Sequence, residues 1–461
     1  MSSSTFWDNE LTPAFKALRG YVGFLAHKFY YNHVWYVNPD HVPAGGTPLV
    51  IVGDHQNSLN DSLGYVFSIR DRKVHFLTRA DLFTLGAAVS KFLSWLGLLP
   101  SYRLQWEGAD ALANNKATFS AAEDVLLKGG TVTLFPEAGH QNKHWLGPFT
   151  SGYLQIAFNA AERSGFSKEI FILPTCNHYS EYFGLWTDMM VRYGTPVSIA
   201  PYYELYKTKP RTAKRQVDAL VREQIKSMML DIEDLDNYSA IDYIRTSAFG
   251  TEFSRSQGLD PDKLPEKLES DKTLVAELAK GGEEENGSLY GDVRTLLDLC
   301  REGGFGETQL SRKVTPLGVG LNFLILLLTL PLAVFCLWPS VISWGLPKLL
   351  AGKMKDKMLL GSFVIGLNAL FILPICGLIT LVCTWIGHGF LRGIVYAALL
   401  PIFCLLEWFW YTLLRDTVRD FNFLRNRGGR ASSAASLREK VFAGLRARFG
   451  VKGPENQHIE K

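Results

Sequence analysis

Apolar residues are distributed very unevenly along this chain of 461 residues. The longest apolar stretches all lie after residue 313, in three blocks that span Val314–Pro347, Met358–Gly387 and Phe390–Leu414. Stretches of this length are long enough to cross the hydrocarbon layer of a membrane. The sequence therefore predicts a globular part followed by an α-helical transmembrane region.

Positively charged residues flank these blocks on the sides that the positive-inside rule assigns to the cytosol. They are Arg312, Lys313, Lys348, Lys353, Lys355, Lys357, Arg415, Arg419, Arg425, Arg427 and Arg430. The first block must then enter the membrane and return, yet two spans need roughly 40 residues and this block is shorter and contains Pro331 and Pro339. We expect a re-entrant or tightly turned hairpin there, and an ordinary hairpin that turns near His388 in the other two blocks. Three plain spans are the alternative.

Charge and cysteine content exclude two classes of protein. The formal net charge is only +3, which does not favour nucleic acid as a partner. None of the six cysteines forms a Cys-x-x-Cys pair, so they read as small hydrophobic residues and not as a disulfide framework. The polar N-terminus lacks the features of a secretory signal, and we expect the globular part to stay in the cytosol.

Short apolar runs alternate with helix-length segments in the globular part. The runs are Pro48–Val52, Lys73–Thr78, Leu98–Tyr102, Thr131–Phe135 and Ile170–Pro174. This alternation predicts an α/β domain, a mixed sheet flanked by helices, with functional residues where strands end.

We divide the chain into five parts. Residues 1–40 form an N-terminal interfacial helix region, 41–235 the α/β domain, 236–313 a polar helical connector, 314–416 the transmembrane hairpins and 417–461 a basic amphipathic tail. A helix over Leu11–Tyr31 could equally cover the edge of the core. In the tail, Leu437, Val441, Leu445 and Phe449 recur every four residues between basic ones, which suits an anionic lipid surface.

The segment VIVGDHQNSLNDSL carries the sharpest chemical signal. A strand ends just before His55, and Asp61 follows six positions later, so a turn must bring the two side chains together. A histidine oriented by a carboxylate can take a proton from an attacking hydroxyl.

A second segment, TVTLFPEAGHQNKHWLGPFTSGYLQIAF, again runs from a strand into a glycine-containing loop and a helix. The loop brings Glu137, His140, Lys143 and His144 to the same sheet edge. Backbone N–H groups at a helix start favour a phosphate there.

Together these segments resemble the phospholipid and glycerol acyltransferase family, the PlsC-like proteins, over roughly residues 45–200. HFLTR, which ends at Arg79, looks like the family's second block, and ILPTCNHYS looks like the fourth. Two features depart from the commonest pattern. Five residues instead of four separate His55 and Asp61, as in a branch of bacterial proteins and fungal glycerol-phosphate acyltransferases, and Ala138 replaces the usual glycine.

The resemblance implies an acyltransferase domain at 41–235. It would move a fatty acyl group from acyl-CoA or acyl carrier protein to a hydroxyl of glycerol 3-phosphate or 1-acylglycerol 3-phosphate in phospholipid biosynthesis. His55 would act as the base and Asp61 would orient it, while Arg79 would hold the phosphate. Glu137 and Gly139 would shape the acceptor site, with His140 and Lys143 as further phosphate contacts. No metal or redox cofactor is implied. The implied location is the bacterial inner membrane. The protein would cross this membrane several times and keep its catalytic domain in the cytosol.

Other interpretations remain open at this stage. His140, His144, Cys176 and His178 could form the zinc site of a hydrolase, although no His-Glu-x-x-His motif accompanies them. A non-catalytic lipid-binding membrane protein is a second alternative. Arg79 alone could be a surface salt-bridge partner.

Overall fold

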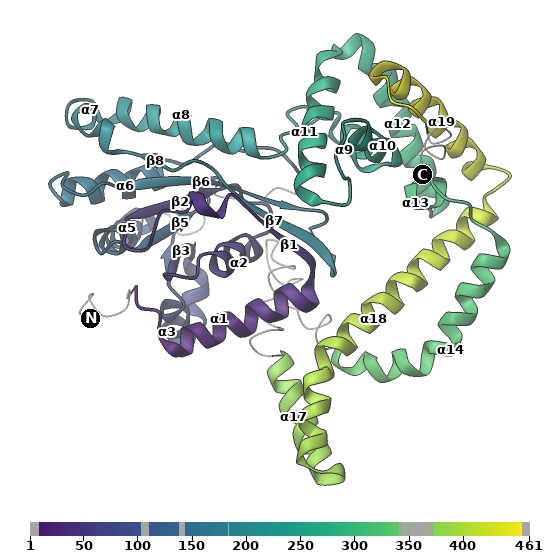
Figure 1. Cartoon of the computed structure of the whole chain (residues 1–461), viewed down its shortest axis with the longest axis horizontal. Helices are drawn as coiled ribbons and strands as arrows, with labels where there is room; N and C mark the ends of the chain where they lie inside the picture. The colour runs from purple at the N-terminus through teal and green to yellow at the C-terminus, as the bar shows by residue number, and fades with distance from the viewer. Residues whose placement is uncertain are drawn as a thin grey trace. The chain divides into compact units, whose positions relative to one another are not determined.

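The chain folds into two compact units. The structure, a computed structural model, describes residues 9–102, 110–137, 143–182, 184–340 and 372–453, and in addition 342, 349 and 368. The sheet unit comprises Met1–Met229 with Met354–Gly366, and the helical unit comprises Leu230–Lys353 with Leu367–Lys461 (Figure 1).

The sheet unit is built on one eight-stranded mixed sheet. Along its main path the strand order is β1-β7-β6-β2-β5-β3-β4, and β8 pairs with β6. The strands are β1 (Tyr31–Val37), β2 (Leu49–Gly53), β3 (Val74–Arg79), β4 (Leu98–Ser101), β5 (Thr131–Leu134), β6 (Phe171–Tyr179), β7 (Thr187–Tyr193) and β8 (Val197–Ser198). β6, β2, β5, β3 and β4 run parallel to one another, whereas β7 and β8 pair antiparallel with β6.

All five predicted strands are present, as β2 to β6, and the predicted fold class is confirmed. β1, β7 and β8 were not predicted. β1 lies at the edge of the sheet beside β7, so polar residues such as Asn32 and His33 interrupt the apolar run by which a buried strand is recognised. β1 also brings part of the expected N-terminal region into the sheet.

Helices cover both faces of the sheet (Figure 1). One apolar core joins α5 (Asp110–Leu127), α6 (Gly152–Arg163) and α8 (Pro210–Met228) to strand residues such as Val50, Val132 and Ile172. α2 (Leu59–Ser68) packs on the opposite face, where Tyr65 contacts Thr175 of β6. Alternate residues of β6 therefore face different helices, as the two-residue period of a strand requires.

Helix α1 (Pro13–Leu25) covers the same side as α2 and α3 (Ala87–Trp95). Phe15 is buried edge-on against Trp95 of α3, and Gly23 lies against Phe67 of α2. Tyr21 and Phe24 are exposed. One side of the expected interfacial helix thus covers the core, while another side presents aromatic residues outward.

The polar part of the helical unit is a cluster of packed helices. α9 (Tyr238–Thr246), α10 (Ala248–Ser256), α11 (Leu264–Lys280), α12 (Gly282–Gly303) and α13 (Glu307–Leu310) pack together with the C-terminal α19 (Arg430–Phe449). Val441, Phe442 and Leu445 of α19 are buried. The structure thus differs from the expected separate connector and lipid-facing tail, because the apolar side of α19 packs on protein.

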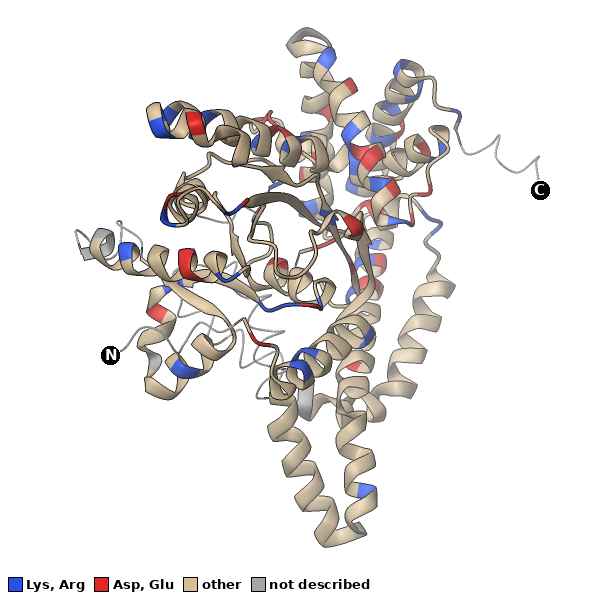
Figure 2. Ribbon diagram, turned by 60° about the vertical axis from the view of Figure 1, so that its left-hand side comes forward, with Lys and Arg blue, Asp and Glu red and all other residues tan. Residues whose placement is uncertain are grey.

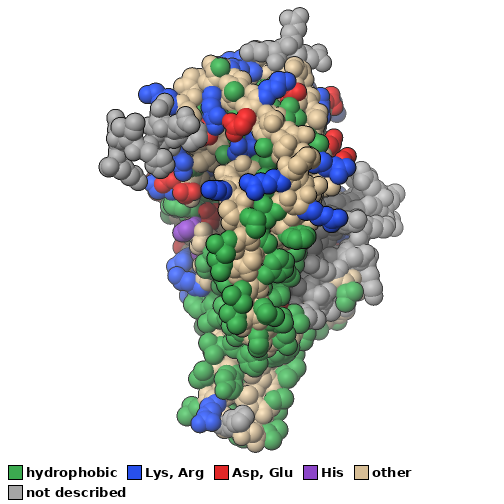
Figure 3. Space-filling view, turned by 90° about the vertical axis from the view of Figure 1, so that its right-hand side faces the viewer, with side chains coloured by type: hydrophobic (Ala, Val, Ile, Leu, Met, Phe, Trp, Pro, Cys, Tyr) green, Lys and Arg blue, Asp and Glu red, His purple; other side chains and the backbone are tan. Residues whose placement is uncertain are grey.

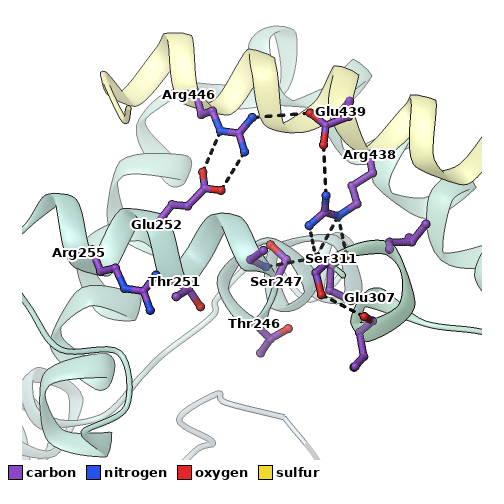
Figure 4. A pocket seen from close by; sticks show the side chains of 13 residues that line it. Thr246, Ser247, Thr251, Glu252, Arg255, Glu307, Ser311, Arg438, Glu439 and Arg446 are labelled. Atoms are coloured by element: carbon purple, nitrogen blue, oxygen red, sulfur yellow. Dashed lines mark hydrogen bonds and ion pairs between the residues drawn. The ribbon is translucent and has the colours of Figure 1, made fainter. Parts of the chain in front are cut away.

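Ion pairs between alternating acidic and basic residues connect α19 to its neighbours. Glu252, Arg446, Glu439, Arg438 and Glu307 form a continuous series of ion pairs across α10, α19 and α13 (Figure 4). These residues line a polar cavity in which Arg255, Arg438 and Arg446 are matched by Glu252, Glu307 and Glu439, so that its charged lining has no net charge.

The described part of the helical unit also contains three apolar helices. They are α14 (Pro316–Ser340), α17 (Leu373–His388) and α18 (Phe390–Arg425). α14 and α18 are long and apolar enough to cross a membrane, and α17 is a shorter apolar helix. Figure 2 shows few charged residues on these helices, and Figure 3 shows hydrophobic side chains covering their outer surface.

The apolar helices agree only in part with the expected hairpins. The chain turns at Gly389, beside His388, where the second hairpin was expected. α14, however, continues through Pro331 as one helix of 25 residues, so the described part of the first block contains no hairpin. A proline is tolerated inside such a helix when neighbouring groups satisfy the freed carbonyl. Most of the segment between Val341 and Phe371, which includes Pro347 and the start of the second block, lies outside the described residues.

Candidate active site

The candidate site lies where β2, β5 and β3 end. Val52 is paired with Leu134, so His55 and Glu137, three residues further along each strand, reach the same level beyond the sheet. β3 lies beside β5 in parallel orientation and ends at Arg79. The carboxyl ends of parallel strands share one edge, which is where ligands bind in open α/β sheets.

His55 and Asp61 are in direct contact. Nδ1 of His55 lies 2.9 Å from Oδ2 of Asp61, and the Asp61 side chain is completely buried. The same oxygen accepts the backbone N–H groups of Gln56 at 3.0 Å and Asn57 at 2.8 Å. Asp61 also lies in the first turn of α2, where the helix dipole favours a negative charge. The predicted turn is therefore confirmed, and it wraps the backbone around the carboxylate.

The ring of His55 is held from a second side. It stacks on Phe135, with 4.1 Å between ring centroids and 8° between planes. In the neutral ring, donation of Nδ1–H to the carboxylate leaves the lone pair on the other ring nitrogen, Nε2. A histidine in this state can accept a proton from a hydroxyl group that approaches Nε2.

Glu137 acts on the backbone around the histidine. Its carboxylate accepts the N–H of His55 at 3.1 Å and the N–H of Gly147 at 3.0 Å. Burial raises the pKa of Glu137 above the usual value for glutamate, and the two N–H groups oppose that shift. Glu137 thus ties the end of β2 to the segment that follows β5.

The remaining predicted residues have different positions. Arg79 lies at the same sheet edge and is paired with Asp81, with 2.6 Å between Nη2 and Oδ2. Lys143 is partly exposed in the segment after β5. Gly139 and His140 lie outside the described residues, so the structure says nothing of their expected roles.

Two buried residues that the sequence did not single out lie beside the predicted ones. The hydroxyl of Tyr179 donates to Oδ1 of Asp61 at 2.7 Å. The carboxyl group of Asp54, next to His55, accepts the N–H of Asn177 at 2.7 Å. Burial raises the pKa of Asp54 well above the usual aspartate value, and the charges of Asp61 and Glu137 raise it further.

The sequence does contain a signal for these contacts. Thr175, Asn177 and Tyr179 occupy every second position near the end of β6, and all three are buried. Polar residues at every second position of a buried strand indicate a polar partner on one face. Here that partner is α2, which carries Asp61 and Tyr65.

Two of the histidines considered as zinc ligands, His144 and His178, lie side by side. The rings of His144 and His178 lie 5.2 Å apart, and Nδ1 of His144 lies 3.0 Å from the hydroxyl of Tyr182. Tyr182 also donates to Oε1 of Gln56 at 2.7 Å. Within the described part of the chain, no group of three or more His, Cys, Asp or Glu residues could hold a metal ion.

Comparisons with known proteins agree with this geometry. Residues 33–177 match the family model "Acyltransferase". Glycerol-3-phosphate O-acyltransferase 2 of Saccharomyces cerevisiae is 26% identical over 135 residues, which are 29% of this chain and only 18% of the yeast protein. The crystal structure of the 1-acyl-sn-glycerophosphate acyltransferase PlsC from Thermotoga maritima has a TM-score of 0.32 at 14% identity, covering 47% of this chain and 82% of that one, a likeness that supports no conclusion by itself. The match to the family model spans His55, Asp61, Arg79 and Glu137, so the similarity to the acyltransferase family covers all four of these residues.

Proposed function

We propose that this protein is a membrane-bound O-acyltransferase of phospholipid synthesis. It transfers a fatty acyl group from acyl-CoA or acyl carrier protein to a hydroxyl of glycerol 3-phosphate or of 1-acylglycerol 3-phosphate. The observation that carries the proposal is the buried contact between His55 and Asp61 inside the segment that matches the family. The name of the yeast relative supports glycerol 3-phosphate as the first acceptor to test.

The reaction needs one base and no covalent acyl-enzyme. His55 takes the proton of the acceptor hydroxyl while the hydroxyl oxygen bonds to the thioester carbon. The tetrahedral intermediate then collapses, the carbon–sulfur bond breaks, and the imidazolium returns its proton to the leaving thiolate. The products are an ester and a free thiol. Asp61 keeps the ring in the tautomer that this step requires and stabilises the imidazolium.

Arg79 is the proposed phosphate contact. One strand, β5, separates β3 from β2, so Arg79 is displaced from His55 by two strand spacings, roughly 10 Å. A phosphate that replaces Asp81 as the partner of Arg79 would form a bidentate, charge-assisted pair. Asp81 is half-exposed, so it can turn toward water when a phosphate binds.

The apolar helices supply the membrane part of the proposal. Leu328 of α14, Ile386 of α17 and Leu391 of α18 are each at least 70% exposed, a pattern that suits contact with lipid tails. Arg312 and Lys313 before α14, and the arginines at the end of α18, favour a cytosolic position for these flanks. We therefore propose a multi-pass protein of the bacterial inner membrane with its acyltransferase domain in the cytosol.

An acyl-transfer assay on the full chain in detergent tests the activity. Palmitoyl-CoA is offered with glycerol 3-phosphate or with 1-acylglycerol 3-phosphate, and acyl carrier protein thioester replaces it in a second series. The test variant is His55→Ala. The matched control is His33→Ala, because His33 also contacts an aspartate, Asp188, but its side chain is 59% exposed.

Ester product that His33→Ala retains and His55→Ala loses supports the proposal and identifies the acceptor. Equal product in both variants contradicts the role of His55. Absence of product from the unaltered chain with every donor and acceptor contradicts the proposed substrate class and favours a lipid-binding function.

Membrane orientation has its own test. A reporter fused after Lys461 should be active only in the cytosol. Activity of the reporter on the outside would contradict the proposed orientation and favour an odd number of spans with an external C-terminus.

A further inference from the structure

Asp61 contacts two side chains through its two carboxylate oxygens. Oδ2 faces Nδ1 of His55, whereas Oδ1 accepts the hydroxyl of Tyr179 at 2.7 Å. Tyr179 is the last residue of β6 and is only 2% exposed. The tyrosine therefore reaches the catalytic pair from behind, on the side of the carboxylate opposite to the histidine.

Matching periods of a strand and a helix create this contact. Thr175, Asn177 and Tyr179 are two residues apart on β6, and Asp61 and Tyr65 are four residues apart on α2, so each set lies on one face of its element. The hydroxyl of Tyr65 lies 2.7 Å from both Thr175 Oγ1 and Asn177 Nδ2. The hydrogen bond between Tyr179 and Asp61 is the last contact of this series, and it lies next to His55.

We propose that Tyr179 is a positioning residue that fixes the Asp61 carboxylate and limits how strongly it stabilises protonated His55. The inference rests on the proposed function only in so far as His55 is the catalytic base. A hydrogen bond to one carboxylate oxygen draws negative charge away from the other. Without the hydroxyl, Oδ2 would hold the Nδ1 proton more strongly and His55 would stay protonated to a higher pH.

Several other groups act on His55 or Asp61 electrostatically, and the test must separate Tyr179 from them. Glu137 faces His55 from the segment after β5, and Asp54 directly follows β2. Tyr31 of β1 and Tyr65 of α2 are buried near Asp61 and Tyr179. All of these remain in place when only the hydroxyl of Tyr179 is removed.

The experiment compares Tyr179→Phe with Tyr153→Phe in the full chain. Tyr153 is a matched control because its buried hydroxyl also donates to an aspartate, Asp218, at 2.7 Å, in a contact between α6 and α8. Diethyl pyrocarbonate reacts with neutral imidazole, so its rate of reaction with His55, followed by mass spectrometry against pH, reports the protonation midpoint without any substrate.

We expect Tyr179→Phe to raise this midpoint by about 0.5 to 1 pH unit and Tyr153→Phe to leave it unchanged. The acidic limb of the kcat/KM profile should move in the same direction, while kcat falls by about tenfold and KM changes by less than about twofold. A purely structural role would lower the yield of folded protein without moving the midpoint, and that result would overturn the proposal.

Two further measurements test the role of Tyr179 independently. In an Asp61→Asn background, Tyr179→Phe should no longer move the midpoint, because the carboxylate that links the two residues is gone. Incorporation of 3-fluorotyrosine at position 179 keeps the packing and makes the hydroxyl a stronger donor, so the midpoint should move to lower pH. A shift of the same sign as in Tyr179→Phe, or none, would refute the inference even if Tyr179→Phe does not fold. Modification of His55 by diethyl pyrocarbonate needs no acyl transfer. This measurement therefore also distinguishes failure of the inference about Tyr179 from failure of the proposed activity.

Discussion

His55 and Asp61 meet at 2.9 Å because Ser58, between them, has a backbone conformation that few side chains adopt. Its φ is 52° and its ψ is −120°, and α2 begins at the next residue. The Asn60 N–H donates to the carbonyl of Asn57 across this turn. The chain thereby reverses within six residues, and the strained residue lies next to the proposed catalytic residues, as strained residues in active sites often do.

The conformation of Ser58 leads to the first prediction. Ser58→Gly should raise the free energy of unfolding by about 1 kcal/mol and keep acyl transfer, because glycine adopts positive φ without strain. Ser58→Val should lower the free energy of unfolding and reduce kcat, because a β-branched residue strongly disfavours this conformation. Chemical denaturation in detergent and the transfer assay measure both. Loss of activity in Ser58→Gly would mean that the hydroxyl, and not the turn, is what the site requires.

The second prediction concerns Asp54. Burial raises the pKa of Asp54 in the folded protein well above the unfolded value of about 3.9. An acid with a raised folded pKa contributes stability that is complete below the unfolded pKa and is lost as pH rises through the folded pKa. Asp54→Asn cannot ionise, and its amide oxygen can still accept the Asn177 N–H. It should therefore be more stable than the unaltered chain, by a margin that grows between pH 5 and pH 8.

Thermal unfolding across that pH range tests the expectation for Asp54. Asp40 lies exposed in the same unit and provides the control. The difference between Asp40→Asn and the unaltered chain should stay small and nearly constant with pH. A margin for Asp54→Asn that shrinks toward pH 8 would show that the ionised carboxylate is stabilised by its surroundings.

The residues of the candidate site also show which features could be predicted from the sequence alone. β2 and β5 were predictable because both faces of a parallel strand are buried and its residues form a continuous apolar run. The adjacent polar residues, His55 and Glu137, were therefore predictable as neighbours at one sheet edge. The contact of Tyr179 with Asp61 joins residues 118 positions apart. The polar positions of β6 indicate a polar partner, but they do not identify α2 as the element that supplies it.

The C-terminal helices show a second limit. The four-residue spacing of Leu437, Val441 and Leu445 predicts an apolar side on α19 but does not determine what covers it. Lipid was the expectation, and α19 instead packs against helices of its own unit. Pro331 predicts an interruption of the first apolar block, yet α14 continues past it, because an apolar environment makes unwinding costly.

The third prediction concerns Gly64, where α2 packs closely on β7. A Cβ atom at this position would lie 2.6 Å from Met189 Cε and from Val191 Cγ2, and the branched valine cannot move aside as methionine can. Gly64→Ala should therefore displace α2, and Asp61 with it. We expect a loss of about 1 to 3 kcal/mol in the free energy of unfolding and a lower kcat.

Gly20 is the matched control for Gly64, because it lies inside α1 and a Cβ atom added there would have no atom within 4 Å. Gly20→Ala should raise the free energy of unfolding by up to about 1 kcal/mol through helix propensity and leave kcat unchanged. If the two substitutions have equal effects, close packing of α2 does not position Asp61.

The fourth prediction concerns the ion pair between Glu307 and Arg438 in the helical unit. Glu307 accepts Nε and Nη2 of Arg438, the hydroxyl of Tyr243 at 2.5 Å and the N–H of Ala248. The Arg438 side chain is only 9% exposed. Glu307→Ala would leave this guanidinium buried without its main partner, and we expect a loss of about 3 kcal/mol in the free energy of unfolding.

Asp298→Ala provides the control, since Arg301 and Asp298 form an ion pair of which both members are largely exposed. Its effect should stay within about 0.5 kcal/mol, because water screens such a pair. The double substitution Glu307→Met with Arg438→Met removes both charges and should recover a large part of the loss, since neither partner is then left buried alone. Urea-dependent loss of helical circular dichroism in detergent measures all three variants. An equal loss for Glu307→Ala and Asp298→Ala would mean that the hydrophobic contacts of Val441, Phe442 and Leu445, and not the charges, hold α19 in place.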